Sequence, residues 1–208
     1  MDKDKIFQKF GNKEYQVNEN TFIMGIHHLL GEHIAKRFEG YNTILDTCCG
    51  AGFMSIALAR YVNQVIIVDI NQNHLEQANN NVKLADVFNK VEFILGDILG
   101  KYVLNKISKI DGAFLDPDWA EVGNSKHTHI SRLSDMQPSA NELFNAVSQM
   151  TENVILRLPR EMDLSELKHL PPHKLEKVYL DNDFKFYCVY FGELRERVGD
   201  TELRVSTK

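Results

Sequence analysis

The sequence predicts an α/β protein built on a doubly wound, mostly parallel, seven-stranded sheet with a C-terminal antiparallel hairpin strand. Short apolar runs alternate with stretches of helical spacing along most of the chain. The run Gln64–Asp69 is continuously apolar before its final acid, as a strand covered on both faces requires. Near the end, the β-rich runs Lys174–Leu180 and Phe184–Phe191 flank a short polar turn, which indicates a hairpin.

The length of 208 residues favours a single domain over residues 1–208, with residues 1–20 a short arm and residues 21–40 a helical segment. The formal net charge of −5 provides no global basic field for a long polyanion, so a nucleic-acid substrate needs a local binding site. Three cysteines without paired spacing indicate small core residues in a reducing compartment. No signal peptide or membrane span is recognisable, so we expect a cytoplasmic protein.

The apolar periodicity assigns the elements in order. Helical spacing predicts helices over Met24–Phe38, Phe53–Tyr61, Gln72–Ala85, Ser139–Met150 and Asp163–Leu170. Apolar runs predict strands over Ile44–Asp46, Gln64–Asp69, Val91–Leu95, Gly112–Leu115 and Asn153–Leu158, besides the two strands of the hairpin. The aperiodic segment Glu121–Pro138 is expected to be a long loop.

The stretch Ile44–Gly52, ILDTCCGAG, ends its apolar run in an acid and opens into a Gly-x-Gly turn. Because glycines let a ligand approach the backbone closely, this turn predicts a nucleotide-type cofactor site. Three later strands also lead into acids, at Asp69, Asp97 and Asp116. The carboxyl ends of parallel strands line one crevice in an open sheet, so we expect the four acidic corners to converge.

The residue pattern favours S-adenosylmethionine over a dinucleotide. Ser55 stands where a dinucleotide fingerprint has its third glycine, and Asp46 would repel a pyrophosphate. A carboxylate there suits the cationic amino-acid end of the methyl donor, directly or through water. Asp69 lies where a carboxylate that binds ribose hydroxyls is expected. The expected cofactor-binding residues are Asp46, Cys48, Gly50, Gly52, Asp69, Ile70, Asp97 and Ile98.

The corner after the fourth strand reads DPDW, from Asp116 to Trp119. An exocyclic amine conjugated to a base is a poor nucleophile, and acceptors for its hydrogens direct its lone pair towards a methyl group. We expect Asp116 and the Pro117 carbonyl to supply these acceptors, and Trp119 to stack on the base as a catalytic and substrate-binding residue. A solvated turn with a core tryptophan is the competing interpretation.

With these motifs, the chain resembles the RNA cap guanine-N2 methyltransferase family, the trimethylguanosine synthase-like members of the class I methyltransferases. The resemblance runs roughly from Thr21 to Arg197 and includes the segments GEHIAKRF, VIIVDINQNHLEQANNN, VEFILGDIL, LDPDW, LRLPREMDLSEL and YFGELRER. It implies a Rossmann-like methyltransferase sheet and methyl transfer to guanine N2 of an RNA or cap-like nucleotide. It also implies that the cofactor binds Asp46, Asp69 and Asp97, and that the base stacks on Trp119.

The DPDW corner departs from the Ser-Pro-Pro-Trp that is usual in this family. Asp116 replaces a neutral serine and Asp118 replaces a proline, which adds negative charge at the mouth of the pocket. A cationic 7-methylguanine would be attracted by that charge, whereas nearby phosphates would be repelled. Asp118 and Phe22 complete the expected substrate-binding residues.

Several residue groups carry weaker signals. The eight histidines, among them His127 and His129, lack ligand spacing, so no metal site is expected. Asn79–Asn81 is expected to be an exposed helix face. The basic residues expected mainly on solvated faces are Lys36, Arg37, Arg157, Arg160, Arg195 and Arg197.

Two other functions remain open from the residues alone. One is methyl transfer to a small molecule or to a protein amide, which the acidic charge favours. The other is a module that binds the cofactor or a modified base without catalysis. The pattern carries no signal about oligomeric state.

Overall fold

The computed structural model describes residues 1–107, 109–119, 130–199 and 201–207. The chain divides into two compact units, Met1–Asp111 and Gly112–Lys208. The first half of the predicted loop Glu121–Pro138, residues 121–129, lies outside the described residues and includes His127 and His129.

The first unit is organised around three parallel strands, β1 (Thr43–Thr47), β2 (Gln64–Asp69) and β3 (Val91–Leu95), with β2 in the middle. All five residues of β1 are buried, as are the last five of β2. Side chains buried on both faces explain the continuous apolar runs by which these strands were predicted. The strands β2 and β3 have the predicted boundaries, and β1 begins one residue earlier and ends one residue later than expected.

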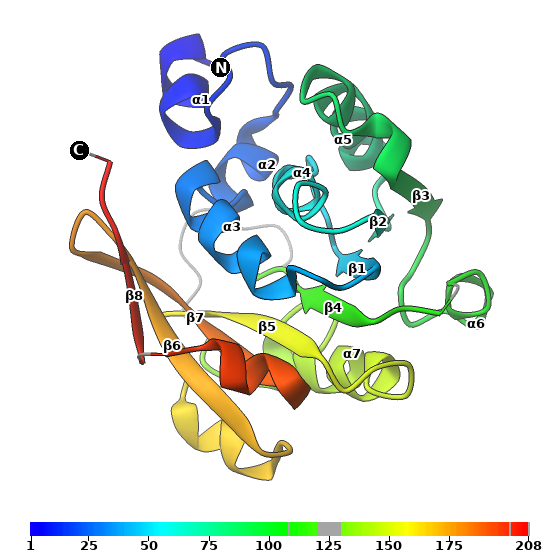
Figure 1. Ribbon diagram of the computed structural model, residues 1–208, viewed down its shortest axis with the longest axis vertical. Helices are drawn as coiled ribbons and strands as arrows, with labels where there is room; N and C mark the ends of the chain where they lie inside the picture. The colour runs from blue at the N-terminus through cyan, green and yellow to red at the C-terminus, as the bar shows by residue number, and fades with distance from the viewer. Residues whose placement is uncertain (108, 120–129, 200, 208) are drawn as a thin grey trace. The chain divides into compact units, whose positions relative to one another are not determined.

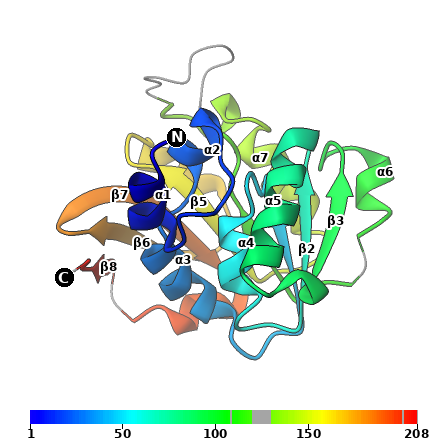
Figure 2. The ribbon, with the colours of Figure 1, turned by 90° about the horizontal axis from the view of Figure 1, so that it is seen from above.

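The helices of this unit follow the predicted alternation with the strands. They are α1 (Lys3–Phe10), α2 (Glu19–Met24), α3 (His28–Ala35), α4 (Phe53–Leu58), α5 (Gln72–Leu84) and α6 (Lys101–Leu104), with short 3-10 turns at Lys36–Phe38 and Phe88–Lys90. Helices α4 and α5 lie side by side on the same face of the three strands (Figures 1 and 2). This helix layer buries the apolar side chains of one face of the sheet.

The predicted helix Met24–Phe38 is wrong at its start. Met24 ends α2, and the next helix begins at His28. Gly25 interrupts the helical run, because its ψ angle of 138° is not helical. A Cβ there would lie 2.8 Å from the Thr21 carbonyl oxygen and 2.9 Å from the Phe10 ring, so this packing requires glycine. The His27 side chain then caps α3 by accepting a hydrogen bond from the Leu29 amide. Tertiary packing of the N-terminal arm therefore decides this boundary.

The second unit has β4 (Gly112–Leu115) parallel to β5 (Val154–Pro159), and the strand order is β4-β5-β7-β6-β8. The predicted antiparallel hairpin is present as β6 (His173–Leu180) and β7 (Asp183–Phe191). The further elements are α7 (Ala140–Val147), β8 (Glu202–Val205) and 3-10 turns at Leu133–Asp135, Leu164–His169 and Gly192–Arg197. Helix α7 packs against β4 (Figure 1).

The elements of the two units confirm the predicted α/β class with a C-terminal hairpin. The described residues contain eight strands against the seven expected, and the additional strand is β8, which pairs in parallel with β6. A search of the described residues found no helix with the length and apolarity needed to cross a membrane.

Candidate active site

The carboxyl ends of β1, β2 and β3 share one edge of the first unit. Asp46 of β1 pairs with Ile67 of β2, and Asp69 of β2 pairs with Leu95 of β3. The carboxyl ends of the three strands therefore lie within a few residues of one another. Asp97 follows β3 by two residues. The structure therefore brings three of the four predicted acidic corners to one edge; the fourth, Asp116, belongs to the second unit.

The glycine loop, Cys48–Gly52, connects β1 to α4 through backbone conformations that favour glycine. The φ angle is +56° at Cys48, +54° at Gly50 and +81° at Gly52. A Cβ added at Gly50 would meet nothing within 4 Å, whereas one at Gly52 would lie 3.0 Å from the Ala78 Cβ of α5. The space beside Gly50 is therefore open, and Gly52 permits close packing against α5.

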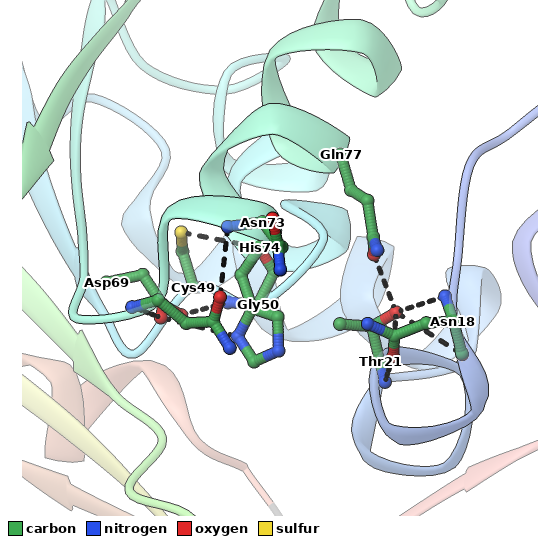
Figure 3. A network of polar contacts seen from close by, with 9 residues as sticks. Asn18, Thr21, Cys49, Gly50, Asp69, Asn73, His74 and Gln77 are labelled. Carbon is green, nitrogen blue, oxygen red and sulfur yellow. Dashed lines mark hydrogen bonds and ion pairs between the residues drawn. The ribbon is translucent and has the colours of Figure 1, made fainter.

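Asp69 ties this loop to the end of β2. Its Oδ2 accepts a hydrogen bond from the Gly50 amide at 2.9 Å (Figure 3). Its Oδ1 accepts one from the Asn71 amide at 2.8 Å. His74 Nδ1 lies 3.3 Å from the same Oδ1. The carboxylate is buried, with 6% of Asp69 exposed, but two oxygens offer about four acceptor directions. Capacity for ligand hydroxyls therefore remains beside its structural contacts.

Asp46 is almost fully buried, with 1% of the residue exposed. Its Oδ2 accepts a hydrogen bond from the Ser55 hydroxyl of α4 at 2.5 Å. The sequence alone marks Ser55 only as the residue that replaces a third glycine, and the structure gives it the second role of holding this carboxylate. The depth of Asp46 favours indirect contact with a ligand over direct contact.

The two expected apolar contacts of the cofactor differ in exposure. Ile70 is 74% exposed directly after Asp69, whereas Ile98 is 4% exposed and belongs to the core. Asp97 is exposed, and its Oδ1 accepts a hydrogen bond from the Leu99 amide at 2.9 Å. An exposed isoleucine beside a loop with open space matches the needs of a flat, partly apolar ligand. An adenosyl cofactor fits the features of this site, which are the open space beside the glycine loop, the exposed Ile70 and the acids at the ends of β1 to β3.

Cys49 of the loop is not arranged as a nucleophile. Burial raises the pKa of the Cys49 thiol well above its ordinary value, and the nearby carboxylates of Asp69 and Asp46 raise it further. A thiol in this environment stays protonated and unreactive. Cys188, in the second unit, is completely buried, which confirms that it is a core residue.

The N-terminal arm packs on the glycine loop through Asn81. This side chain, fully buried, accepts from the Gln16 amide at 2.7 Å and donates to the carbonyl oxygens of Gln16 and Ala51 at 2.9 Å each. The expectation that Asn79–Asn81 is an exposed helix face is therefore wrong for Asn81, because the third residue of that run turns towards the arm. An asparagine so placed satisfies backbone groups that would otherwise be buried unpaired.

Aromatic rings strengthen the same attachment of the arm. The Phe10 ring stacks on the Phe53 ring of α4, with centroids 3.6 Å apart and an interplanar angle of 6°. Phe22 is half-buried in α2 and meets Phe10 edge-on at 5.7 Å. The Thr21 hydroxyl donates to the Gln77 side chain of α5 at 2.8 Å (Figure 3). Helix α1 thus lies within the predicted arm (residues 1–20) and α2 mostly within the predicted helical segment (residues 21–40), and they contact α4 and α5.

In the second unit, the DPDW corner (Asp116–Trp119) follows β4 and meets a basic residue from β5. Leu115 pairs with Leu156, which places the next residues of the two parallel strands beside each other. Arg157 Nη1 donates to Asp116 Oδ2 at 2.7 Å, and the side chains are 8% and 21% exposed. The expectation of a solvated face is wrong for Arg157. A charge inside the apolar run VILRLP was the sequence signal for a buried pair.

Arg157 also lies between two aromatic rings. Its guanidinium carbon is 4.4 Å from the centroid of the Trp119 ring and 4.5 Å from that of Phe186 on β7. Asp118 fixes the corner by backbone pairing with Gln137, at 2.7 Å and 3.0 Å. Pro117 is buried and Trp119 is half-buried. Side-chain and backbone contacts therefore order the corner, and it is not a solvated turn.

The electrostatics of Asp116 combine opposing effects. Burial raises the pKa of its carboxyl above the ordinary value, whereas the charge of Arg157 and its hydrogen bond lower the pKa. The Asp118 carboxylate adds a smaller increase. The net shift is upward, so Arg157 is the group that favours the ionised form of this acid.

Metal ligation finds no support in the part of the chain that the structure describes. A search there for three or more His, Cys, Asp or Glu side chains that could hold a metal ion found no such group. The donor groups at the two sites are carboxylates, backbone groups and aromatic faces, which suit organic ligands.

Comparisons with known proteins find methyltransferases among the relatives of this chain. A curated relative is an RNA methyltransferase from Synechocystis, described as uncharacterized, which is 30% identical over 116 residues; these are 53% of this chain and 24% of that protein. The chain thus spans about a quarter of the length of that relative, and 39% of the length of each of two methyltransferases from Leptospira interrogans.

Solved structures show the same fold. A protein described as a methyltransferase from Porphyromonas gingivalis W83 superimposes with a TM-score of 0.75 and 17% identity, covering 91% of this chain and 47% of that one. The TrmK protein of M. capricolum, solved with S-adenosylhomocysteine, has a TM-score of 0.54 and 17% identity, covering 77% of this chain and 66% of that one.

The match to a sequence family is more informative than the similarity of fold. The sequence model of the RNA cap guanine-N2 methyltransferase family matches residues 41–194, which contain the glycine loop, the DPDW corner and Arg157. The match confirms the resemblance found in the sequence. The chain belongs to the RNA cap guanine-N2 methyltransferase family.

Proposed function

We propose that this protein transfers a methyl group from S-adenosylmethionine to an exocyclic amine, guanine N2 of an RNA or a cap-like nucleotide. The observation that carries the proposal is the DPDW corner, where Arg157 pairs with the Asp116 carboxylate and its guanidinium lies over the Trp119 ring. Membership of a guanine-N2 family supports the same acceptor. The curated RNA methyltransferase from Synechocystis supports RNA as the substrate class.

Residues of the first unit would hold the donor. Asp69 has acceptor capacity for the ribose hydroxyls, and Gly50 leaves room beside the loop. Ile70 offers an exposed apolar surface to the adenine, and Asp97 follows at the end of the next strand. Asp46 would attract the cationic amino-acid end of the donor. When bound, S-adenosylmethionine supplies a methyl group activated by a positively charged sulfur.

Residues of the second unit would prepare the acceptor. A free carboxylate direction of Asp116 and the Pro117 carbonyl can accept the two amine hydrogens, which orients the nitrogen lone pair. Trp119 would hold the plane of the base by stacking. Once methylated, the nitrogen carries a positive charge and must lose one proton, and Asp116 is an acceptor for that proton.

Labelled methyl transfer tests the proposal. The protein is incubated with a donor labelled in its methyl group and with RNA, cap analogues or guanine nucleotides, and the products are digested and analysed by mass spectrometry. We expect label on guanine N2, and loss of transfer in Asp116→Ala and Trp119→Ala. Label that never appears on a base amine would contradict the proposal.

One alternative has a specific observation in its favour. The net charge of −5 suits a small or uncharged acceptor better than a long polyanion. Rapid turnover of a small molecule or of a protein amide in the absence of nucleic acid would support this alternative. Transfer that survives both substitutions in the corner would show that Asp116 and Trp119 do not have the proposed roles.

A further inference from the structure

Ser55 and Asp46 form a polar pair in apolar surroundings. Ser55 is the only polar residue of α4, whose six residues are all buried, and Asp46 is the only charged residue of β1, which is also buried throughout. The Ser55 hydroxyl donates to Asp46 Oδ2 at 2.5 Å, and the two residues are 0% and 1% exposed. A buried hydroxyl or carboxylate costs free energy unless it is hydrogen-bonded, so each group requires a partner of this kind.

Stability alone does not explain this pair. Replacement of two buried hydrogen-bonded groups by apolar groups of the same shape is often neutral or stabilising, because no polar group is then removed from water. A hydrogen bond donated to a carboxylate is stronger than one between neutral groups, and it favours the ionised form of the acid. The physical effect of the pair is therefore to keep a negative charge at the end of β1.

The pair also connects the two sides of the glycine loop. Asp46 precedes the loop Cys48–Gly52 along the chain and Ser55 follows it, so their hydrogen bond ties the carboxylate to the helix that leaves the loop. The space beside Gly50 is open. The charge of Asp46 acts inside the loop, because it contributes to the raised pKa of the Cys49 thiol.

A glycine at position 55 could not make this contact. A dinucleotide fingerprint has its third glycine at this position, where it allows close packing of the helix on the strand. Here a hydroxyl at the same position holds a carboxylate, which repels a pyrophosphate and attracts a cation. The serine and the acid therefore act together on the choice of ligand.

We propose that Ser55 is a positioning residue of the donor site: its hydrogen bond holds Asp46 ionised and oriented beside the glycine loop, so that the site selects a cofactor with a cationic amino-acid end. Ser55 acts through Asp46 and needs no contact with the donor. Asp46 in turn acts on the amino group directly or through water. This inference rests on the proposed function, which assigns Asp46 to that end of S-adenosylmethionine.

The test compares two ligands that differ only in the amino group. S-adenosylhomocysteine and its desamino analogue share the adenosine, the sulfur and the carboxylate, and only the former carries a protonated amine at neutral pH. Calorimetry with the full chain gives both dissociation constants, and their ratio reports the contribution of the amine. In the wild-type protein we expect S-adenosylhomocysteine to bind at least about tenfold more tightly, as the loss of a charged hydrogen-bonded group requires.

Three variants locate the source of this preference. Ser55→Ala removes the hydroxyl and should reduce the ratio to about threefold or less, chiefly by weakening the binding of S-adenosylhomocysteine. Ser55→Thr keeps the hydroxyl and should keep the ratio near the wild-type value, even if its extra methyl group lowers thermal stability. Asp46→Asn should also remove the preference. In the Asp46→Asn background, Ser55→Ala should change the ratio no further, because Ser55 acts through the acid.

Ile56→Val is the matched control. It removes one buried methylene from the next residue of α4 and removes no polar group. We expect a lower midpoint of thermal unfolding and an unchanged ratio. If Ser55→Ala behaves in the same way, its role is merely structural and the inference is overturned. A further loss of the ratio when Ser55→Ala is added to Asp46→Asn would also overturn it.

The outcomes separate this inference from the proposed function. A wild-type preference for the amine that survives Ser55→Ala would overturn only the role of Ser55. Equal binding of the two ligands to the wild-type protein would contradict the role of Asp46, and the inference with it, but not an adenosyl site. If S-adenosylhomocysteine does not bind at all, the donor assignment itself is contradicted.

Discussion

Replacement of Asn81 by alanine should loosen the N-terminal arm and the glycine loop together. The fully buried Asn81 side chain makes three hydrogen bonds, two to the backbone of Gln16 and one to the Ala51 carbonyl oxygen. Alanine cannot replace any of them, and the three backbone groups would lose their partner inside the protein. At roughly 1 kcal/mol net for each bond, the free energy of unfolding should fall by about 3 kcal/mol.

The adjacent asparagine provides the control. Asn80 is half-buried and makes one side-chain bond, to Gln16 Oε1 at 2.8 Å. Asn80→Ala should therefore lower the free energy of unfolding by less than about 1 kcal/mol. In a chain of this size, about 3 kcal/mol corresponds to a decrease of roughly 10 °C in the midpoint of thermal unfolding.

Thermal and urea unfolding of the two variants would measure this difference, and calorimetry with S-adenosylhomocysteine would measure the effect on the loop. Because Ala51 belongs to the glycine loop, Asn81→Ala should also weaken cofactor-product binding, and Asn80→Ala should not. Equal stability of the two variants would refute the assignment of Asn81 as the attachment point of the arm.

Three other predictions follow from the same contacts. Asp69→Asn should weaken S-adenosylhomocysteine binding by at least about tenfold in calorimetry, because the amide nitrogen cannot accept one of the two backbone hydrogen bonds. Arg157→Met should raise the pKa of Asp116 and move the acidic limb of the pH profile of methyl transfer to higher pH; an unmoved limb would contradict a role for the carboxylate form. Phe10→Ala should lower the free energy of unfolding by about 3 kcal/mol, and Phe7→Ala, on the exposed side of the same helix, by less than about 0.5 kcal/mol.

Most of the fold could be predicted because strand burial leaves a strong mark in the sequence. The run that became β2 is bounded as predicted, since continuous apolar residues that end in an acid have few other structural solutions. Strand β3 also has its predicted bounds, although only Ile94 of its five residues is buried. Short elements were missed: α1, α6 and β8 have four to eight residues each. Such elements have too few periodic positions to stand out, and packing on the rest of their unit stabilises them.

The chemistry of the first site was predictable in type but not in detail. The acids at the strand ends are visible in the sequence, and a parallel register brings those of β1 to β3 to one edge. The hydrogen bond from Ser55 to Asp46 and the contact of His74 with Asp69 were not predicted. Both contacts depend on which helix residue faces the end of the neighbouring strand. The apolar periodicity of the sequence does not specify that residue.

The sequence by itself determined the α/β class, the donor-type glycine loop and the position of the DPDW corner, because these follow from local patterns of burial and backbone conformation. Only the tertiary structure decided the partners of the charged and polar side chains. Asn81 became the internal attachment point of the arm, and Arg157 became the counter-charge of Asp116. The physical reason is that a polar residue in an apolar run must find a partner, and that partner comes from a segment distant in the sequence.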